Sequence, residues 1–311
     1  MRRLIALLVA GSAALLASLV VFAVPAAPGW NRELAFRYLE GRQREWAAWK
    51  PAQKPGGPCI SCHTGLSYML ARRTLAESQP HAEERQLVEA VTARVQMEPL
   101  PQTLPDEGAE VILNLLTLSL QRRDATRPPS AVERKAIEHL WQKQIGTEHA
   151  DADARGSWSW VDAELDPFDA AHSTYFGSAL ALLAVSPYPD VDRTRVEATR
   201  QYLARTASRQ PLHHRLAWVA FGGASPKDVE AVTTQAWRGQ AADGGWTSAS
   251  LGPWLPHGAE APADRGSNAY ATAWTTFALA RAGVACTEPR LSRALDWLAQ
   301  HQDRTTGSWP S

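Results

Sequence analysis

Cysteine and methionine are scarce in this chain of 311 residues, with three of each. Three cysteines are too few for a disulfide framework. Net charge is also absent, because 32 Lys and Arg balance 32 Asp and Glu, and no basic run occurs. This balance argues against a general nucleic-acid-binding protein. Segments with the alternating, Val/Ile/Thr-rich pattern of strands are few, so the sequence predicts an all-α fold.

The first 27 residues have the features of a targeting segment. Arg2 and Arg3 precede residues 4–24, an uncharged apolar run, and Pro25-Ala26-Ala27 follows. At about 1.5 Å per residue the run is just long enough to span a bilayer, and the two arginines orient its N-terminus toward the cytoplasm. We expect residues 1–27 to be a cleaved signal peptide or a retained membrane anchor; the alternative is a buried core helix. Residues 28–311 would then form one domain, in the periplasm or on the outer face of the cytoplasmic membrane.

The remaining chain predicts helices of two kinds. An apolar helix must be covered on all sides, whereas an amphipathic helix is covered on one. Apolar segments alternate with charged, amphipathic ones in the second half of the chain, which predicts an inner and an outer layer. The predicted helices are 30–49, 60–78, 85–97, 107–121, 130–144, 170–185, 191–207, 212–222, 226–238, 268–283 and 289–301.

Tryptophan recurs at the ends of the outer-type helices. The chain has 13 Trp against six Phe and six Tyr. A glutamine amide can cap exposed backbone while an indole covers the turn, and glycine permits a close approach. The recurring sets are Trp141-Gln142 before Gly156-Ser157-Trp158, Trp237 and Gln240 before Gly244-Gly245-Trp246, and Trp297, Gln300 and Gln302 before Gly307-Ser308-Trp309.

Residues 240–246 and 302–309 resemble the QW repeats of squalene–hopene and oxidosqualene cyclases. The resemblance extends over residues 106–309 and implies an α/α toroid of alternating inner and outer helices, a fold shared with protein prenyltransferases. It does not extend to the Asp-x-Asp-Asp acid of those cyclases, because the chain offers only Asp166-Pro167-Phe168-Asp169 ahead of an inner helix and Asp151-Ala152-Asp153 in a loop. Protonating an alkene needs a strong, preorganised acid. We expect no squalene cyclisation, and we expect Asp169 to cap the helix at 170–185.

The chemistry of the chain is concentrated in Cys59-Ile60-Ser61-Cys62-His63. Cys-x-x-Cys-His is the attachment signature of c-type haem, and the pentapeptide resembles that of cytochromes c. Cys59 and Cys62 would form the two thioethers, and His63 would be the proximal ligand of the iron. Export agrees with this prediction, because covalent haem attachment takes place outside the cytoplasm. The sequence therefore predicts one haem c.

Two other interpretations of the motif stay open. Cys59 and Cys62 could form a reducible disulfide, although this leaves His63 unexplained. Alternatively, Cys59, Cys62 and His63 could hold zinc with one further ligand. Protein prenyltransferases, which share the fold that the resemblance implies, hold zinc at the mouth of their ring.

Three alternatives are open for the sixth coordination position of the iron. Met97 lies in a proline-stiffened loop of the kind from which small cytochromes present a distal methionine. His172, His213 and His214 are predicted to begin inner helices and could converge on the same rim of the ring. A five-coordinate iron is the third alternative. Met69 is excluded, because it lies only about 9 Å beyond His63 along one helix.

The motif and the ring together suggest electron transfer or redox sensing by a monohaem c-type protein, with a redox partner that the sequence does not name. The alternative is a haem-dependent or diverged terpenoid-processing enzyme acting on a hydrophobic isoprenoid in an apolar central cavity. A third possibility is a binding module in which the haem is structural. The aromatic residues predicted to line the cavity, or else to pack between the layers, are Trp160, Phe168, Tyr175, Trp218, Tyr270 and Trp274.

Overall fold

The computed structural model describes residues 29–61, 64–75, 81–122, 124, 126–253 and 266–309. The predicted targeting segment, residues 1–27, lies outside the described residues. Within them the regular secondary structure is helical apart from a short antiparallel hairpin of β1 (Gln53–Lys54) and β2 (Gly57–Pro58) and one isolated bridge between Leu165 and Asp169. The prediction of an all-α fold is confirmed. No helix in this part of the chain is long and apolar enough to cross a membrane.

Each predicted helical segment overlaps one α-helix of the described structure, and all but 85–97 contain it fully, since α3 begins at Ala82. The largest boundary difference is at α2, which begins at Gly65 rather than at residue 60. Short 3-10 turns, η1 (Lys50–Ala52), η2 (Ala171–Ser173) and η3 (Ala207–Arg209), join some of them. The α-helices are α1 (Arg32–Ala48), α2 (Gly65–Leu75), α3 (Ala82–Gln96), α4 (Glu107–Leu120), α5 (Ala131–Gln142), α6 (Thr174–Val185), α7 (Arg193–Thr206), α8 (Leu212–Phe221), α9 (Pro226–Arg238), α10 (Ala269–Arg281) and α11 (Pro289–Gln300).

Side-chain caps fix where most of these helices begin. A short polar side chain before the first turn accepts hydrogen bonds from amide groups that have no partner within the helix. In α5 the cap is reciprocal, because Glu133 also accepts a hydrogen bond from the backbone of Ser130. The capping residues are Asn31, Asp106, Ser130, Asp192, Ser225, Asn268 and Glu288.

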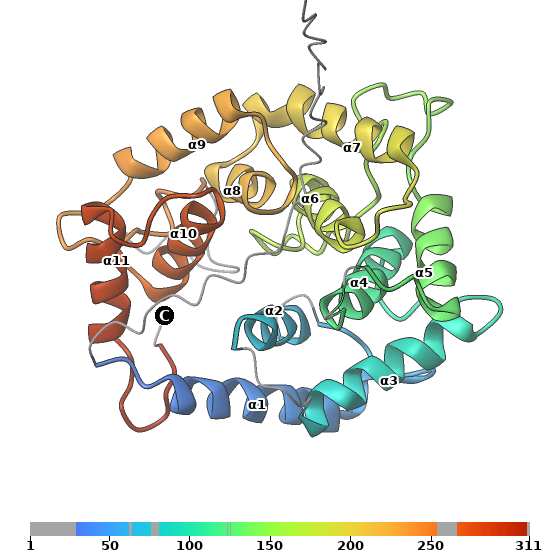
Figure 1. The fold of residues 1–311 in the computed structure, drawn as a ribbon, viewed down its shortest axis with the longest axis horizontal. Helices are drawn as coiled ribbons and strands as arrows, with labels where there is room; N and C mark the ends of the chain where they lie inside the picture. The colour runs from blue at the N-terminus through green and yellow to red at the C-terminus, as the bar shows by residue number, and fades with distance from the viewer. Residues whose placement is uncertain are drawn as a thin grey trace, which may run out of the picture.

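The helices are arranged in two layers (Figure 1). Helices α2, α4, α6, α8 and α10 lie on the inside, and α1, α3, α5, α7, α9 and α11 lie around them. Neighbouring inner helices pack on each other from α4 through α6 and α8 to α10, and each of these four carries an outer helix on its other side. Helix α6 is buried at every position after Thr174, whereas α9 buries only Val232 and Ala236. The predicted alternation of fully covered and half-covered helices is therefore observed.

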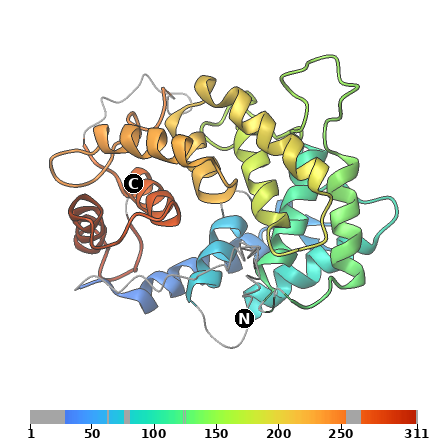
Figure 2. The same ribbon diagram turned by 45° about the horizontal axis from the view of Figure 1, so that its top comes forward.

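The two ends of the described chain meet beside α1 and α11 (Figures 1 and 2). The backbone N–H of Asn31 donates to Oε1 of Gln302 over 2.7 Å, and Nε2 of Gln302 donates back to the carbonyl of Asn31 over 2.9 Å. The rings of Trp30 and Trp309 lie 6.2 Å apart beside this pair. The last turn of the described chain is therefore docked on the first.

The predicted glutamine–glycine–tryptophan turns share one set of contacts. In each turn a glutamine amide donates to the carbonyl of the glycine and to a backbone carbonyl at the start of the next outer helix. In the first turn this glutamine is Gln144, not the predicted Gln142, whose amide instead bonds Glu138 on its own helix. The bonds run from Gln144 to Gly156 and Arg195 (3.4 and 2.9 Å), from Gln240 to Gly244 and Arg290 (2.9 and 2.8 Å), and from Gln302 to Gly307 and Asn31 (3.0 and 2.9 Å).

Glycine is required in these turns for two reasons. Gly156, Gly244 and Gly307 all have positive φ, at +91°, +96° and +80°, a conformation that side chains disfavour. A Cβ atom on Gly307 would also lie 2.2 Å from the carbonyl carbon of Leu34, in the first turn of α1. The glycines thus let each turn lie directly against the next outer helix.

Candidate functional site

Cys59 lies at the end of the β hairpin and is held by its backbone. It is a free cysteine with 6% of its surface exposed. Its N–H donates to the carbonyl of Ala52 over 2.9 Å, and its carbonyl accepts a 2.9 Å hydrogen bond from Nε1 of Trp46 on α1. Burial raises the pKa of the Cys59 thiol, and Arg94 and Lys54 only partly oppose this rise. A raised pKa is the opposite of what thiols that exchange disulfides require.

The motif leads directly into α2. Ser61 accepts from the N–H of Thr64 at its hydroxyl over 3.0 Å and from the N–H of Leu66 at its carbonyl over 2.9 Å. Cys62 and His63 themselves lie outside the described residues. Cys59 to Ser61 thus lie between the hairpin and the N-terminal end of α2, and the predicted roles of Cys62 and His63 stay predictions.

The hairpin before Cys59 is held by a buried arginine, Arg94 on α3. Arg94 is fully buried, and its guanidinium donates to three backbone carbonyls of the hairpin. The acceptors are the carbonyls of Pro58 at 2.9 Å, Gly57 at 3.3 Å and Pro55 at 3.4 Å. Its planar fork can engage several carbonyls at once, which a lysine cannot do. Arg94 therefore positions the segment that presents Cys59.

A buried polar network connects Arg94 to helix α4. Nη1 of Arg94 donates to Oδ1 of Asn114 over 3.4 Å and lies 3.7 Å from Oε1 of Glu110. Glu110 also accepts from Nδ2 of Asn114 at 3.0 Å and from the backbone N–H groups of Thr103 and Leu104, each at 3.0 Å. The buried cation thus has a buried anion that is itself hydrogen-bonded, as burial of a charge requires. The analysis of the sequence did not identify this network, and the only signal was a glutamate and an asparagine four residues apart in an otherwise apolar helix.

Met97, the predicted distal ligand, is the residue that ends α3. It is half-buried, and its N–H donates to the carbonyl of Arg94 over 3.1 Å. Ala90, Arg94 and Met97 are spaced along one helix face, and the first two contact the glycines of the hairpin. The structure therefore places Met97 on the helix face that packs against the Cys59 segment. No described contact joins its side chain to Cys59.

His213 and His214, at the start of α8, are both fully buried. A 2.5 Å hydrogen bond joins Nε2 of His213 and the hydroxyl of Tyr270 on α10, and Nε2 of His214 donates to the carbonyl of Pro167 over 2.9 Å. Burial lowers the pKa of His213 well below its usual value and lowers that of His214 to about 4, so both imidazoles are neutral at pH 7. Since Nε2 of His214 carries the proton, its buried Nδ1 is an unprotonated nitrogen without a hydrogen-bond partner among the described residues.

His172 lies at the exposed edge of this histidine group. Its Nε2 is 3.0 Å from Oδ1 of Asp166, and its ring centroid is 4.9 Å from that of His214. The structure thus brings the three histidines close to one another. Their expected convergence on the rim that holds His63 is not tested, because His63 lies outside the described residues. The structure does not show them next to Cys59, and in Figure 1 α8 lies on the opposite side of the inner layer from α2.

The predicted cavity-lining aromatics separate into two sets. Phe168, Tyr270 and Trp274 are half-buried and surround His213, with ring centroids 5.1 to 5.9 Å from it. Tyr175 instead packs toward the outer layer, because its hydroxyl donates to the carbonyl of Leu203 on α7 over 3.2 Å.

Trp218 has its ring edge-on to that of Tyr175, at 6.3 Å. For these two residues the interlayer alternative is correct. Trp160 is buried, and its indole N–H donates to the carbonyl of Phe168 over 2.7 Å. Phe176 lies in the cluster around His213 and was not predicted there.

Asp169 does not cap α6, contrary to expectation. The helix begins at Thr174, with Ser173 in the capping position and the 3-10 turn η2 ahead of it. The backbone of Asp169 instead pairs with that of Leu165 in an isolated bridge. The four residues between Asp169 and the helix explain the difference, because a capping carboxylate must lie immediately before the first turn.

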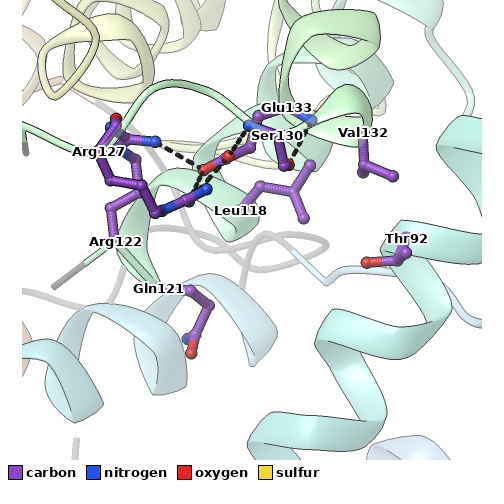
Figure 3. A pocket seen from close by; sticks show the side chains of 8 residues that line it. All are labelled: Thr92, Leu118, Gln121, Arg122, Arg127, Ser130, Val132 and Glu133. Carbon is purple, nitrogen blue, oxygen red and sulfur yellow. Dashed lines mark hydrogen bonds and ion pairs between the residues drawn. The ribbon is translucent and has the colours of Figure 1, made fainter. Parts of the chain in front are cut away.

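A pocket of about 260 Å³ lies among α3, α4 and α5 (Figure 3). Its charged residues are paired with one another: Glu133 accepts from Nη1 of Arg122 at 3.1 Å and from Nη2 of Arg127 at 2.9 Å. Burial disfavours the ionised Glu133, but hydrogen bonds from Ser130 and both arginines outweigh it and hold the pKa at about 2. The arrangement fixes the turn between α4 and α5. The lining residues are Thr92, Leu118, Gln121, Arg122, Arg127, Ser130, Val132 and Glu133.

Within the described ranges no three His, Cys, Asp or Glu residues are arranged to hold a metal ion. Comparison of the chain with protein-family models, with curated proteins and with solved structures gives no match.

Proposed function

We propose that this chain is an exported or membrane-anchored monohaem c-type protein that serves electron transfer or redox sensing. The observation that carries the proposal is the pentapeptide 59–63, with its Cys-x-x-Cys-His spacing. Its first cysteine is a free thiol, and the segment around it is held in place between the hairpin and α2. The N-terminal leader supports export, and with it the compartment in which haem is attached.

We also propose that the fold is an α/α toroid of the kind found in squalene cyclases. The support is the two-layered arrangement of helices and the three glutamine–glycine–tryptophan turns, which make the same contacts to the next outer helix. The contact between Asn31 and Gln302 supports closure of the outer layer into a ring.

The donor set fits a covalently attached haem. Cys59 and Cys62 supply two thiols and His63 an imidazole, which are the groups that such a haem takes. When bound, the haem supplies reversible one-electron chemistry. The chain's own contribution is positional: Arg94 fixes the hairpin through three carbonyls, and Trp46 fixes the carbonyl of Cys59. Met97 and the histidines at 172, 213 and 214 remain the proposed candidates for the distal position.

A pyridine haemochrome spectrum tests the proposal. The full chain should be produced together with a cytochrome c maturation system and extracted with acidified acetone, which removes haem that is not covalently bound. The expected result is a c-type spectrum corresponding to one haem per chain that persists after extraction. A chain without haem that contains one zinc, or a disulfide between Cys59 and Cys62, would overturn it in favour of the corresponding alternative.

The second candidate function is binding or processing of a hydrophobic isoprenoid. The observation that favours it is the half-buried cluster of Phe168, Tyr270 and Trp274 around the neutral His213. Titration with farnesol, followed by tryptophan fluorescence, tests it. Saturable quenching that is lost in Trp274→Ala and kept in Trp237→Ala, on an outer helix, would support this candidate. An unsaturable response would count against it.

A further inference from the structure

We propose that the surface formed by Trp49, Lys50 and Lys54 is the docking site for an acidic redox protein that exchanges one electron with this chain. The inference rests on the proposed haem at Cys59, and it names the partner's chemistry and the place where it binds. A one-electron exchange makes and breaks no bond, so this surface has only to bind the partner.

Trp49 is an exposed anchor at the end of α1. With 53% of its surface exposed, it is the most exposed large apolar side chain among the described residues. Tyr38, exposed to 41%, lies on the same face of α1, eleven residues earlier. Exposed aromatic side chains are enriched where proteins bind one another.

Trp49 is connected to the haem-attachment motif by two successive contacts. Its ring centroid lies 5.3 Å from that of Trp46. The indole N–H of Trp46 in turn donates to the carbonyl of Cys59 over 2.9 Å. Two side chains, Trp49 and Trp46, therefore separate a partner seated on Trp49 from an attachment residue.

The surface carries unpaired positive charge. Residues 46–75 contain no Asp or Glu, while Lys50 and Lys54 are exposed. The neighbouring arginines of α1 are already neutralised, Arg42 by Glu45 and Arg44 by Glu83. The two lysines thus give residues 49–54 a net positive charge, to which an acidic partner is complementary.

An anionic membrane is the competing occupant, because tryptophan and lysine are also found at membrane interfaces. The contact from Trp46 to Cys59 favours a redox protein. It connects this surface to the attachment motif, a connection that membrane binding does not require.

The first experiment locates the anion-binding surface without using redox chemistry. Hexacyanochromate(III), an inert paramagnetic anion, is titrated into the ¹⁵N-labelled full chain. We expect broadening of the indole signals of Trp49 and Trp46, loss of that broadening in the double variant Lys50→Glu/Lys54→Glu, and no change in Lys227→Glu, an exposed lysine on α9. Absence of broadening at Trp49 would overturn the proposal.

The second experiment measures electron transfer from the reduced, haem-loaded protein. At low ionic strength, oxidation by ferricyanide should be about tenfold slower in the double variant than in the wild type. Oxidation by the cationic tris(phenanthroline)cobalt(III) should be faster, and both differences should vanish in high salt. Unchanged rates in a haem-loaded protein contradict the docking surface alone, whereas a protein without haem contradicts the proposed function. Sedimentation with phosphatidylserine vesicles that depends on Lys50 and Lys54, without these rate changes, would identify a membrane contact instead.

Discussion

Asn31 and Gln302 exchange two hydrogen bonds across 271 residues of sequence. Gln302 simultaneously donates to the carbonyl of Gly307, over 3.0 Å, and is only 4% exposed. One amide therefore joins the first outer helix, the last outer helix and the final turn. Gln144 and Gln240 make the same kind of connection between other pairs of outer helices.

Removing this amide should destabilise the fold. Gln302→Ala leaves the N–H and the carbonyl of Asn31 without their partner, which should cost about 2–4 kcal/mol. The matched control is Gln142→Ala, since Gln142 is exposed and bonds only Glu138. Urea unfolding followed by circular dichroism measures both. Equal midpoints for the two variants would show that the contact between the chain ends does not stabilise the fold.

The tight turn at Gly307 should tolerate no side chain. Gly307→Ala combines the positive φ with a Cβ that would lie 2.2 Å from the backbone of Leu34, and should cost about 2–4 kcal/mol. Gly283 has φ of +94° but open space around it, so Gly283→Ala should cost only about 1–2 kcal/mol. Thermal unfolding of the two variants separates the free-energy cost of the steric clash, present only at Gly307, from the cost of the positive φ, present at both positions. A variant at Gly307 as stable as the one at Gly283 would argue against the close approach.

Stability should fall as the pH is lowered from about 6.5 toward 4. The folded-state pKa of His214 is lowered to about 4 and that of His213 is also lowered, both chiefly by burial. The unfolded chain therefore binds more protons in this range, so that the stabilisation is complete above pH 6.5 and is lost as these groups protonate. For His214 the difference is about 3 kcal/mol.

Urea midpoints at pH 7.5 and 5.0 measure this effect. His214→Gln, which keeps a donor for the carbonyl of Pro167, should reduce the difference between the two pH values. His149→Gln, at an exposed position, should not reduce it. A pH dependence that is the same in all three proteins would refute the assignment.

Arg94 should be irreplaceable by lysine. Arg94→Lys keeps the charge beside Glu110 but cannot reach three carbonyls, which should cost about 2–3 kcal/mol and lower the yield of haem-loaded protein. Arg238→Lys, at an exposed position of α9, is the control. Unfolding midpoints and the ratio of haem to protein are measured together. Full stability of Arg94→Lys would show that the hairpin does not depend on the guanidinium.

The helices were predictable from the sequence because inner helices are covered on all sides and outer helices on one, so the two kinds differ in composition. Every position of α6 after Thr174 is apolar or small, and α9 has only a narrow apolar stripe, so composition alone separates inner from outer. The turn glutamines were less predictable. Gln142 and Gln144 both follow Trp141, and only the geometry of the turn decides that Gln144 reaches Arg195.

The surroundings of the motif were not predictable in the same way. Arginine is rarely buried, so nothing in the sequence marks Arg94 as a core residue. Its burial depends on Glu110 and Asn114 from another helix, and such a pairing leaves no local pattern in the sequence. The side of α6 that Tyr175 faces was not predictable either. Every position of α6 after Thr174 is buried, so periodicity does not show that the Tyr175 ring points toward α7 rather than toward the Phe168 cluster.

The intact mass of the chain shows directly whether a haem is covalently attached at Cys59 and Cys62. The protein should be made with a cytochrome c maturation system as wild type, Cys59→Ser, Cys62→Ser and Cys286→Ser. The account predicts the mass of one haem added to the wild type and to Cys286→Ser, and loss or a marked reduction of that added mass in the other two. An unmodified wild-type mass under these conditions would contradict it.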